Sequence, residues 1–346
     1  MTGLFIEFRD PLFGIIVFFV LIFVVAIISY WWGRYKLKIE GRTLERFAEQ
    51  FHKLPNEKEL KSLIQEGTLS EKSWLLLAHT YEKDGDYEKA IEIYQALIEF
   101  QKESSQRRET MLLLGQSYFK AGFLERSKEI FLQILKTHPR TPQALEQLLL
   151  VYEYLQEYSH AIEVLEPLEE LGMDAGKDKL YLKAVSLMKN SKIDQNEKIA
   201  TLISQYREHR QLSYLIFEYL FRVDTKEAWK ALDMSEAKRI SDILWQLNED
   251  ALNLDIISSD KFLSELYTAR GVVNLAKESS VFELDVLIRL RCSDKKVATL
   301  QFEYLCKNCK HVFPFSFHRC PNCHSIDSIE SEAILTKDFI EENYSF

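Results

Sequence analysis

Glycine and proline are scarce in this chain of 346 residues, which contains 11 glycines and 7 prolines. Sheet-rich and nucleotide-binding folds use glycine in turns and phosphate loops, so the scarcity favours helices joined by short turns. The sequence also lacks a glycine-rich phosphate loop, a G-x-S-x-G nucleophile motif and an H-E-x-x-H metal motif. We therefore predict that the protein is not an enzyme and has no catalytic residues.

The chain has no surplus of positive charge. It carries 44 Lys and Arg against 53 Asp and Glu, for a net charge of −9. General nucleic-acid binding requires cations that displace counterions from phosphates, so we expect no nucleic-acid partner. Hydrophobic residues make up 47% and charged residues 28% of the chain, which is typical of a folded protein rather than a disordered one.

One long apolar run is present, over residues 11–32, and Leu12 to Ile28 contains no charge. Twenty-two helical residues span about 33 Å, close to the roughly 30 Å of a bilayer core. The run ends in aromatic residues at 30–32, and cations follow at 34, 36, 38 and 42. The positive-inside rule then places residues 1–10 outside the cytoplasm as a short N-terminus and the bulk of the chain inside it. A cleaved signal peptide is the alternative, but Glu7, Asp10 and the missing small-residue cleavage site disfavour it.

A repeated pattern of large and small residues follows, typical of tetratricopeptide repeats. Tyr118 and Tyr152 are separated by the 34-residue period of such repeats. We predict helical repeats over residues 57–300, clear to about 171 and degenerate afterwards, with a juxtamembrane linker or helix over 33–56. Repeat arrays usually bind proteins, but the sequence pattern does not single out the binding residues. The exposed charges Arg107, Arg108 and Arg126 are more typical of a solvated face than of a binding site. The pattern occurs at Trp74, Ala78, Tyr81, Ala90, Tyr94 and Leu97; at Met111, Leu114, Gly115, Tyr118, Ser127, Phe131 and Ile134; and at Leu145, Leu148, Leu149, Tyr152, Ala161, Leu165 and Leu168.

Four of the five cysteines form two C-x-x-C pairs near the end of the chain. Cys306 and Cys309 are separated by ten residues from Cys320 and Cys323. Two such turns can place four thiolates around one tetrahedral ion, either zinc or iron. Because four cysteines leave no open coordination position, we predict a structural site in a metal-binding domain over 301–335, with a tail over 336–346. Residues 301–305 and 312–317 are rich in aromatic and aliphatic side chains and are expected to form strands.

Other possible ligands lie close to these cysteines. His311, His318 or His324 could replace one cysteine, although four cysteines already complete the shell. Cys292 lies outside the spacing and is interpreted as a small hydrophobic residue. A disulfide would require an oxidising compartment, which the predicted topology contradicts.

In order, these segments resemble the lipopolysaccharide assembly protein B family of Gram-negative bacteria. The resemblance rests on Trp32-Gly33-Arg34, on the repeat helices 114–122 and 144–152, and on the two cysteine pairs. It implies an all-α tetratricopeptide-repeat superhelix with one N-terminal transmembrane helix and a small C-terminal rubredoxin-like or zinc-ribbon knuckle. It also implies a single-pass protein of the cell inner membrane, with a periplasmic N-terminus and a cytoplasmic bulk. The chain departs from the family at Lys310-His311, where Gly-Phe is common, and at His318-Arg319, where an aromatic residue precedes the third cysteine.

The resemblance also implies a function. Members regulate lipopolysaccharide biosynthesis as adaptors that bring a deacetylase of the lipid A pathway to a membrane-bound AAA+ protease. Expected partners are these two proteins and other lipopolysaccharide assembly proteins, and a homodimer is compatible with the sequence. Two alternatives stay open: a general scaffold for another envelope assembly, and a membrane-tethered rubredoxin-type electron carrier.

Overall fold

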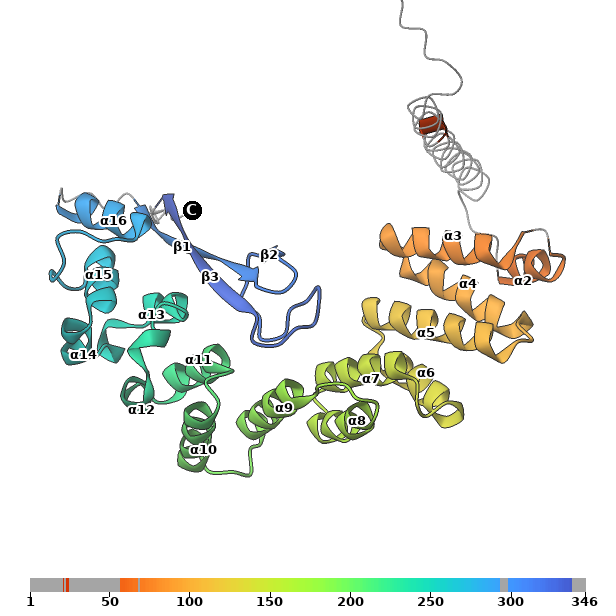
Figure 1. Ribbon diagram of the computed structural model, residues 1–346, viewed down its shortest axis with the longest axis horizontal. Helices are drawn as coiled ribbons and strands as arrows, with labels where there is room; N and C mark the ends of the chain where they lie inside the picture. Colours follow the sequence, from red (N-terminus) through yellow and green to blue (C-terminus); the bar gives the residue numbers. More distant parts are fainter. Residues whose placement is uncertain (1–20, 22, 25–56, 68, 293–297, 338–346) are drawn as a thin grey trace, which may run out of the picture. The chain divides into compact units, whose positions relative to one another are not determined.

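The structure, a computed structural model, describes residues 21, 23–24, 57–67, 69–292 and 298–337. Within these ranges it is mostly helical (Figure 1). The described residues belong to two compact units, one within residues 1–144 and the other within 145–346. The predicted membrane span 11–32 lies outside the described residues except at positions 21, 23 and 24, which are helical. Among the described residues, no helix has the length and apolar character that a membrane crossing needs. The predicted N-terminus 1–10, linker 33–56 and most of the tail also lie outside the described part.

The first unit consists of successive helices that pack against one another. Small residues let these helices approach closely: a Cβ atom added to Gly115 would come within 2.7 Å of the Phe131 ring. Trp74, Ala78 and Tyr94 are almost completely buried between the helices, as the repeat pattern predicts. The helices are α2 (Glu57–Gln65), α3 (Glu71–Lys83), α4 (Tyr87–Phe100), α5 (Ser104–Lys120) and α6 (Leu124–Thr137).

The turns between paired helices share one backbone conformation. Gly85 follows α3 and Gly122 follows α5, and both have φ +81°. In each turn the next amide N–H returns to a carbonyl oxygen of the helix, as in the 2.9 Å bond from Phe123 to Tyr118. The equivalent residue after α7 (Pro142–Tyr154) is Gln156, which takes φ 61° although it has a side chain. The three turns therefore repeat one helix-ending motif.

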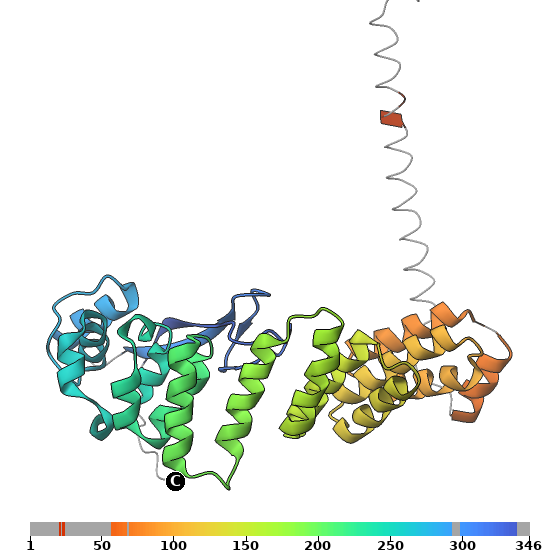
Figure 2. The same ribbon diagram turned by 60° about the horizontal axis from the view of Figure 1, so that its bottom comes forward.

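The second unit begins with similar helix pairs and then becomes irregular (Figure 2). The helices α12, α13 and α14 have only six or seven residues, so the 34-residue period does not continue there. The helices are α8 (Tyr158–Glu170), α9 (Gly176–Lys189), α10 (Gln195–Glu208), α11 (Ser213–Val223), α12 (Thr225–Ala231), α13 (Ser241–Gln246), α14 (Leu254–Ser259), α15 (Lys261–Arg270) and α16 (Phe282–Cys292), with 3₁₀ turns at Met234–Glu236 and Glu249–Ala251.

A three-stranded antiparallel sheet closes the second unit. Its strands are β1 (Ala298–Cys306), β2 (Val312–Phe313) and β3 (Ile329–Lys337), in the order β2-β1-β3. Leu300, Phe302 and Tyr304 alternate along β1 and are buried, and the sheet contacts α13 and α16. The second strand ends at residue 313 rather than at 317, because Pro314 has no amide N–H for the ladder.

Candidate metal centre

The first cysteine pair forms a tight turn at the end of β1. Cys306 is the last residue of the strand, and its N–H donates to the carbonyl oxygen of His311 at 2.9 Å. The N–H of Lys310 returns to the carbonyl oxygen of Cys306 at 2.9 Å. Lys310 has φ 60°, a left-handed conformation in which glycine is usually favoured. The turn buries Cys306 and leaves Cys309 half-buried.

The second pair has the same backbone hydrogen bonds. The N–H of Cys320 donates to the carbonyl oxygen of Ser325, and the N–H of His324 donates to that of Cys320, both at 2.9 Å. His324 has φ 58°, matching Lys310 in the first turn. Cys320 is buried and Cys323 is half-buried, so the two C-x-x-C segments are local copies of one another.

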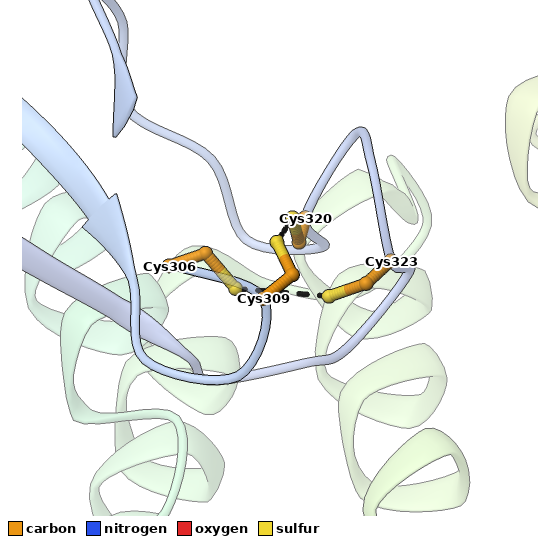
Figure 3. Close-up of side chains that lie close together, drawn as sticks. All are labelled: Cys306, Cys309, Cys320 and Cys323. Atoms are coloured by element: carbon orange, nitrogen blue, oxygen red, sulfur yellow. Dashed lines mark hydrogen bonds between the residues drawn. The ribbon is translucent and has the colours of Figure 1, made fainter. Parts of the chain in front are cut away.

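The two turns bring four sulfur atoms together (Figure 3). All four Sγ atoms lie within 4.8 Å of one another, and the Cys306–Cys323 and Cys309–Cys320 distances are both 3.7 Å. Tetrahedral zinc–sulfur bonds of about 2.3 Å require sulfur atoms about 3.8 Å apart. The donor set therefore fits a tetrahedral metal ion, and it has the chemistry for zinc or for iron.

The surroundings of the sulfur atoms shift the thiol pKa in opposite directions at different cysteines. Burial opposes ionisation of Cys306, but hydrogen bonds with the Cys309 amide and with the hydroxyls of Ser328 and Ser325 outweigh it and lower the pKa of its thiol to about 5. Burial dominates at Cys320 and raises the pKa of that thiol. One thiolate thus forms readily while its neighbour keeps a proton, which metal binding would displace.

Three histidines were considered as possible metal ligands: His311, His318 and His324. Among the described residues, the cluster of possible ligands contains the four cysteines and none of these histidines. The imidazole of His318 lies against Glu218 on α11, with Nε2 and Oε2 2.7 Å apart, within hydrogen-bond distance. The His311 ring packs against Phe313, with ring centroids 5.4 Å apart. Cys292 ends α16, and its side chain lies outside the described part.

Arg319, which precedes the third cysteine, inserts between helices of the second unit. Its Nε donates to Glu153 Oε2 on α7 at 2.7 Å, and its Nη2 lies 2.9 Å from Asp178 Oδ1 on α9. The guanidinium also stacks 5.3 Å from the centre of the Tyr181 ring, and only 9% of the side chain is exposed. In the sequence, Arg319 stands out only as a departure from a family pattern. Its partners Glu153 and Asp178 lie too far away along the chain for any local sequence pattern to predict the contact.

Further contacts hold the sheet and the second turn on the helices. Arg239 forms an ion pair with Asp327, with Nη2 and Oδ1 2.5 Å apart. The buried carboxylate of Asp242 on α13 accepts hydrogen bonds from Tyr214 at 2.5 Å and from Tyr304 at 3.0 Å. Burial raises the pKa of Asp242, and the two phenols only partly oppose that effect. The metal centre is thus attached through polar side chains to α7, α9, α11 and α13.

The three arginines considered as possible binding residues of the repeats are not part of the metal centre. Arg107 and Arg126 are exposed and Arg108 is half-exposed, all in the first unit. Arg107 and Arg108 line a hollow of about 300 Å³ between α5 and α6.

Comparison with known proteins identifies the repeats. Residues 71–104 and 109–141 each match the tetratricopeptide repeat family. A tetratricopeptide repeat protein from Parabacteroides merdae is similar over 64% of this chain and 87% of its own, with 16% identity and a TM-score of 0.39. A putative kinesin light chain from Podosopora anserina, with nearly identical TPR-like repeats, is similar over 68% of this chain and 99% of its own, with 16% identity and a TM-score of 0.26. No curated protein matches the chain.

Residues 71–141 therefore contain two tetratricopeptide repeats. Repeats of this family generally mediate protein–protein interactions, which supports a role as a scaffold or adaptor.

Proposed function

We propose that this protein is a membrane-anchored adaptor that holds proteins on its repeat helices and performs no chemistry of its own. The observation that carries the proposal is the combination of two tetratricopeptide repeats with four cysteine sulfur atoms that lie close enough together to hold one metal ion. A metal ion with four cysteine ligands offers no position for a substrate or for an activated water molecule. Its chemistry when bound is structural, because it links the two cysteine turns.

The finer proposal concerns place and partners. The chain is a single-pass protein of the cell inner membrane with its bulk in the cytoplasm, and it regulates lipopolysaccharide biosynthesis. It brings a deacetylase of the lipid A pathway to a membrane-bound AAA+ protease. The support is the order of sequence features: an apolar run ending in Trp32-Gly33-Arg34, then the repeats, then Cys306 to Cys323.

Electron transfer is the second candidate function, because a tetrahedral set of four sulfur atoms also suits redox-active iron. Two of the cysteines, Cys309 and Cys323, are only half-buried. Metal analysis separates the two functions. Zinc excludes electron transfer at this site, whereas iron that cycles with a physiological reductant would support it.

Affinity purification of the tagged full-length chain from detergent-solubilised membranes tests the adaptor proposal. We expect both a membrane-bound AAA+ protease and the lipid A deacetylase to co-purify, with the deacetylase accumulating in cells that lack the chain. If a different set of envelope proteins co-purifies, the scaffold role stands and the lipopolysaccharide role is wrong. If no protein is enriched over a control with an unrelated anchored protein, the adaptor proposal itself is wrong.

A further inference from the structure

A cavity of about 260 Å³ lies between α7, α8, the start of α9 and the second cysteine turn. Its inner wall is apolar. A volume of this size is below the roughly 300–1,000 Å³ of sites for small molecules and cofactors, but it can accept a single large side chain. The apolar wall consists of Leu149, Leu150, Leu165, Leu168, Met173 and Ala175.

The rim of the cavity is acidic. Glu146 on α7 and Asp174 in the turn before α9 both line it and are exposed. Asp174 accepts a hydrogen bond from the N–H of Gly176, and neither carboxylate forms an ion pair with any residue that the structure describes. Asp178, also at the cavity, is already paired with Arg319. The rim therefore attracts positive charge.

The one cationic side chain of Lys or Arg type among the described residues that line the cavity is already paired within the protein. Arg319 lines the cavity with more than nine-tenths of its side chain buried. Its Nη2 atom lies 2.9 Å from Asp178 Oδ1 and its Nε donates to Glu153, so carboxylates of the protein itself compensate this guanidinium. Arg319 therefore does not pair with the exposed carboxylates Glu146 and Asp174 at the rim.

From the apolar wall and the acidic rim we propose that the cavity binds a short segment of a partner protein. The segment inserts one apolar side chain and places a flanking Lys or Arg against Glu146 and Asp174. This inference rests on the proposed adaptor function and names the chemistry of one partner. An acidic segment does not fit, because it would meet two exposed carboxylates.

The second cysteine turn forms one wall of this cavity. Arg319, Cys323 and His324 all line it, and all belong to the segment that the four-sulfur site organises. A turn this small depends on its metal for folding, so the wall should be lost when the metal is removed. Binding of the partner segment is therefore expected to require a filled metal site.

Selection of random peptides displayed on phage, with the full-length protein in detergent as bait, tests the proposal. We expect enriched peptides to carry an apolar residue within a few positions of Lys or Arg. The charge-reversed variant Glu146→Lys with Asp174→Lys should bind a selected peptide at least about tenfold more weakly, since two favourable charge contacts become repulsive. The matched control, Glu249→Lys with Asp250→Lys, makes the same charge change at exposed positions and should stay within about twofold of the original chain.

Several outcomes would overturn the proposal. These are failure to enrich any peptide, enrichment of acidic peptides, or equal weakening by the test and control variants. Unchanged peptide affinity after the metal is chelated would contradict the role of the cysteine turn. If the charge-reversed variant still co-purifies with the same membrane proteins at unchanged levels, this cavity is not their binding site, while the adaptor function stands.

Discussion

At the scale of single residues, Arg319 connects the second cysteine turn to two helices of the second unit. Its guanidinium compensates two carboxylates, Glu153 and Asp178, that belong to different helices. Burial raises the pKa of Glu153, and the neighbouring Arg319 and Tyr181 act in the opposite direction. Without the guanidinium, Glu153 would be a buried charge with little compensation.

Arg319→Ala should therefore destabilise the second unit by about 3–5 kcal/mol, the usual cost of removing one partner from a buried ion pair. Urea unfolding followed by circular dichroism measures the loss. Arg222→Ala is a suitable control, because Arg222 is 72% exposed and pairs with Glu218 at 3.6 Å. That change should cost less than about 1 kcal/mol. Equal losses in the two variants would show that Arg319 acts as a surface residue.

Asp242 gives a prediction with a definite pH dependence. Its pKa is raised in the folded protein, so the folded state binds the proton more tightly than the unfolded chain does. Its contribution to stability is therefore complete below the ordinary aspartate pKa and is lost as the pH rises through the raised value. Asp242→Asn keeps an oxygen acceptor for Tyr214 and Tyr304 without the buried charge.

We expect the unfolding free energy of Asp242→Asn, relative to the unchanged chain, to increase between pH 4 and pH 8. Urea unfolding across this range gives the comparison. Asp255→Asn, at an exposed position on α14, should show no such trend. A relative stability that instead falls as the pH rises would mean that the Asp242 carboxylate is favoured by folding.

At the scale of elements, the two cysteine turns require a left-handed residue after the second cysteine of each pair. Lys310 and His324 take this conformation although both have a Cβ atom. For such residues the left-handed region costs roughly 1–2 kcal/mol, and glycine largely avoids that cost. The backbone therefore accepts Lys310 at a position where the family that the sequence resembles commonly has glycine, and this substitution lowers the stability of the turn.

Replacing the exposed Lys310 with Gly should stabilise the metal-loaded turn by about 1 kcal/mol, because it relieves the backbone at that position. Thermal unfolding of the metal-loaded protein measures the gain. Lys307→Gly makes the same substitution in the same turn at a residue without positive φ, and should give no gain. A gain at residue 307 and none at residue 310 would refute the assignment of strain.

At the scale of the whole molecule, local sequence patterns predicted the repeat helices and the cysteine turns better than they predicted the contacts between segments that are distant in sequence. The small-residue positions, such as Gly115 against Phe131, and the four cysteines follow from spacing within short segments. The contacts between parts do not: Arg319 and Glu153 are 166 positions apart, and neither segment signals the other. The third strand was also not predicted, because its alternation includes Glu330 and Glu332 and resembles a polar segment.

The shortening of the later helices has a similar explanation. The repeat pattern fades after about residue 171, and the structure has irregular short helices from α12 to α14 instead of regular pairs. These helices pack among α11, α15 and the sheet, so packing partners distant in sequence, rather than a periodic pattern, determine where they end. The predicted membrane span stays a prediction from composition alone.

Hydrogen–deuterium exchange before and after removal of the metal tests most directly whether the four-sulfur site holds the C-terminal segment on the helices. In the loaded protein, we expect slow exchange over residues 298–337 and at the parts of α7 and α9 around Glu153 and Asp178. Chelation should accelerate exchange in all of these segments, while α3 to α6 stay unchanged, because the site supplies the folding energy of a segment with little core of its own. Unchanged exchange over 298–337, or an equal increase throughout the chain, would contradict a metal-dependent attachment.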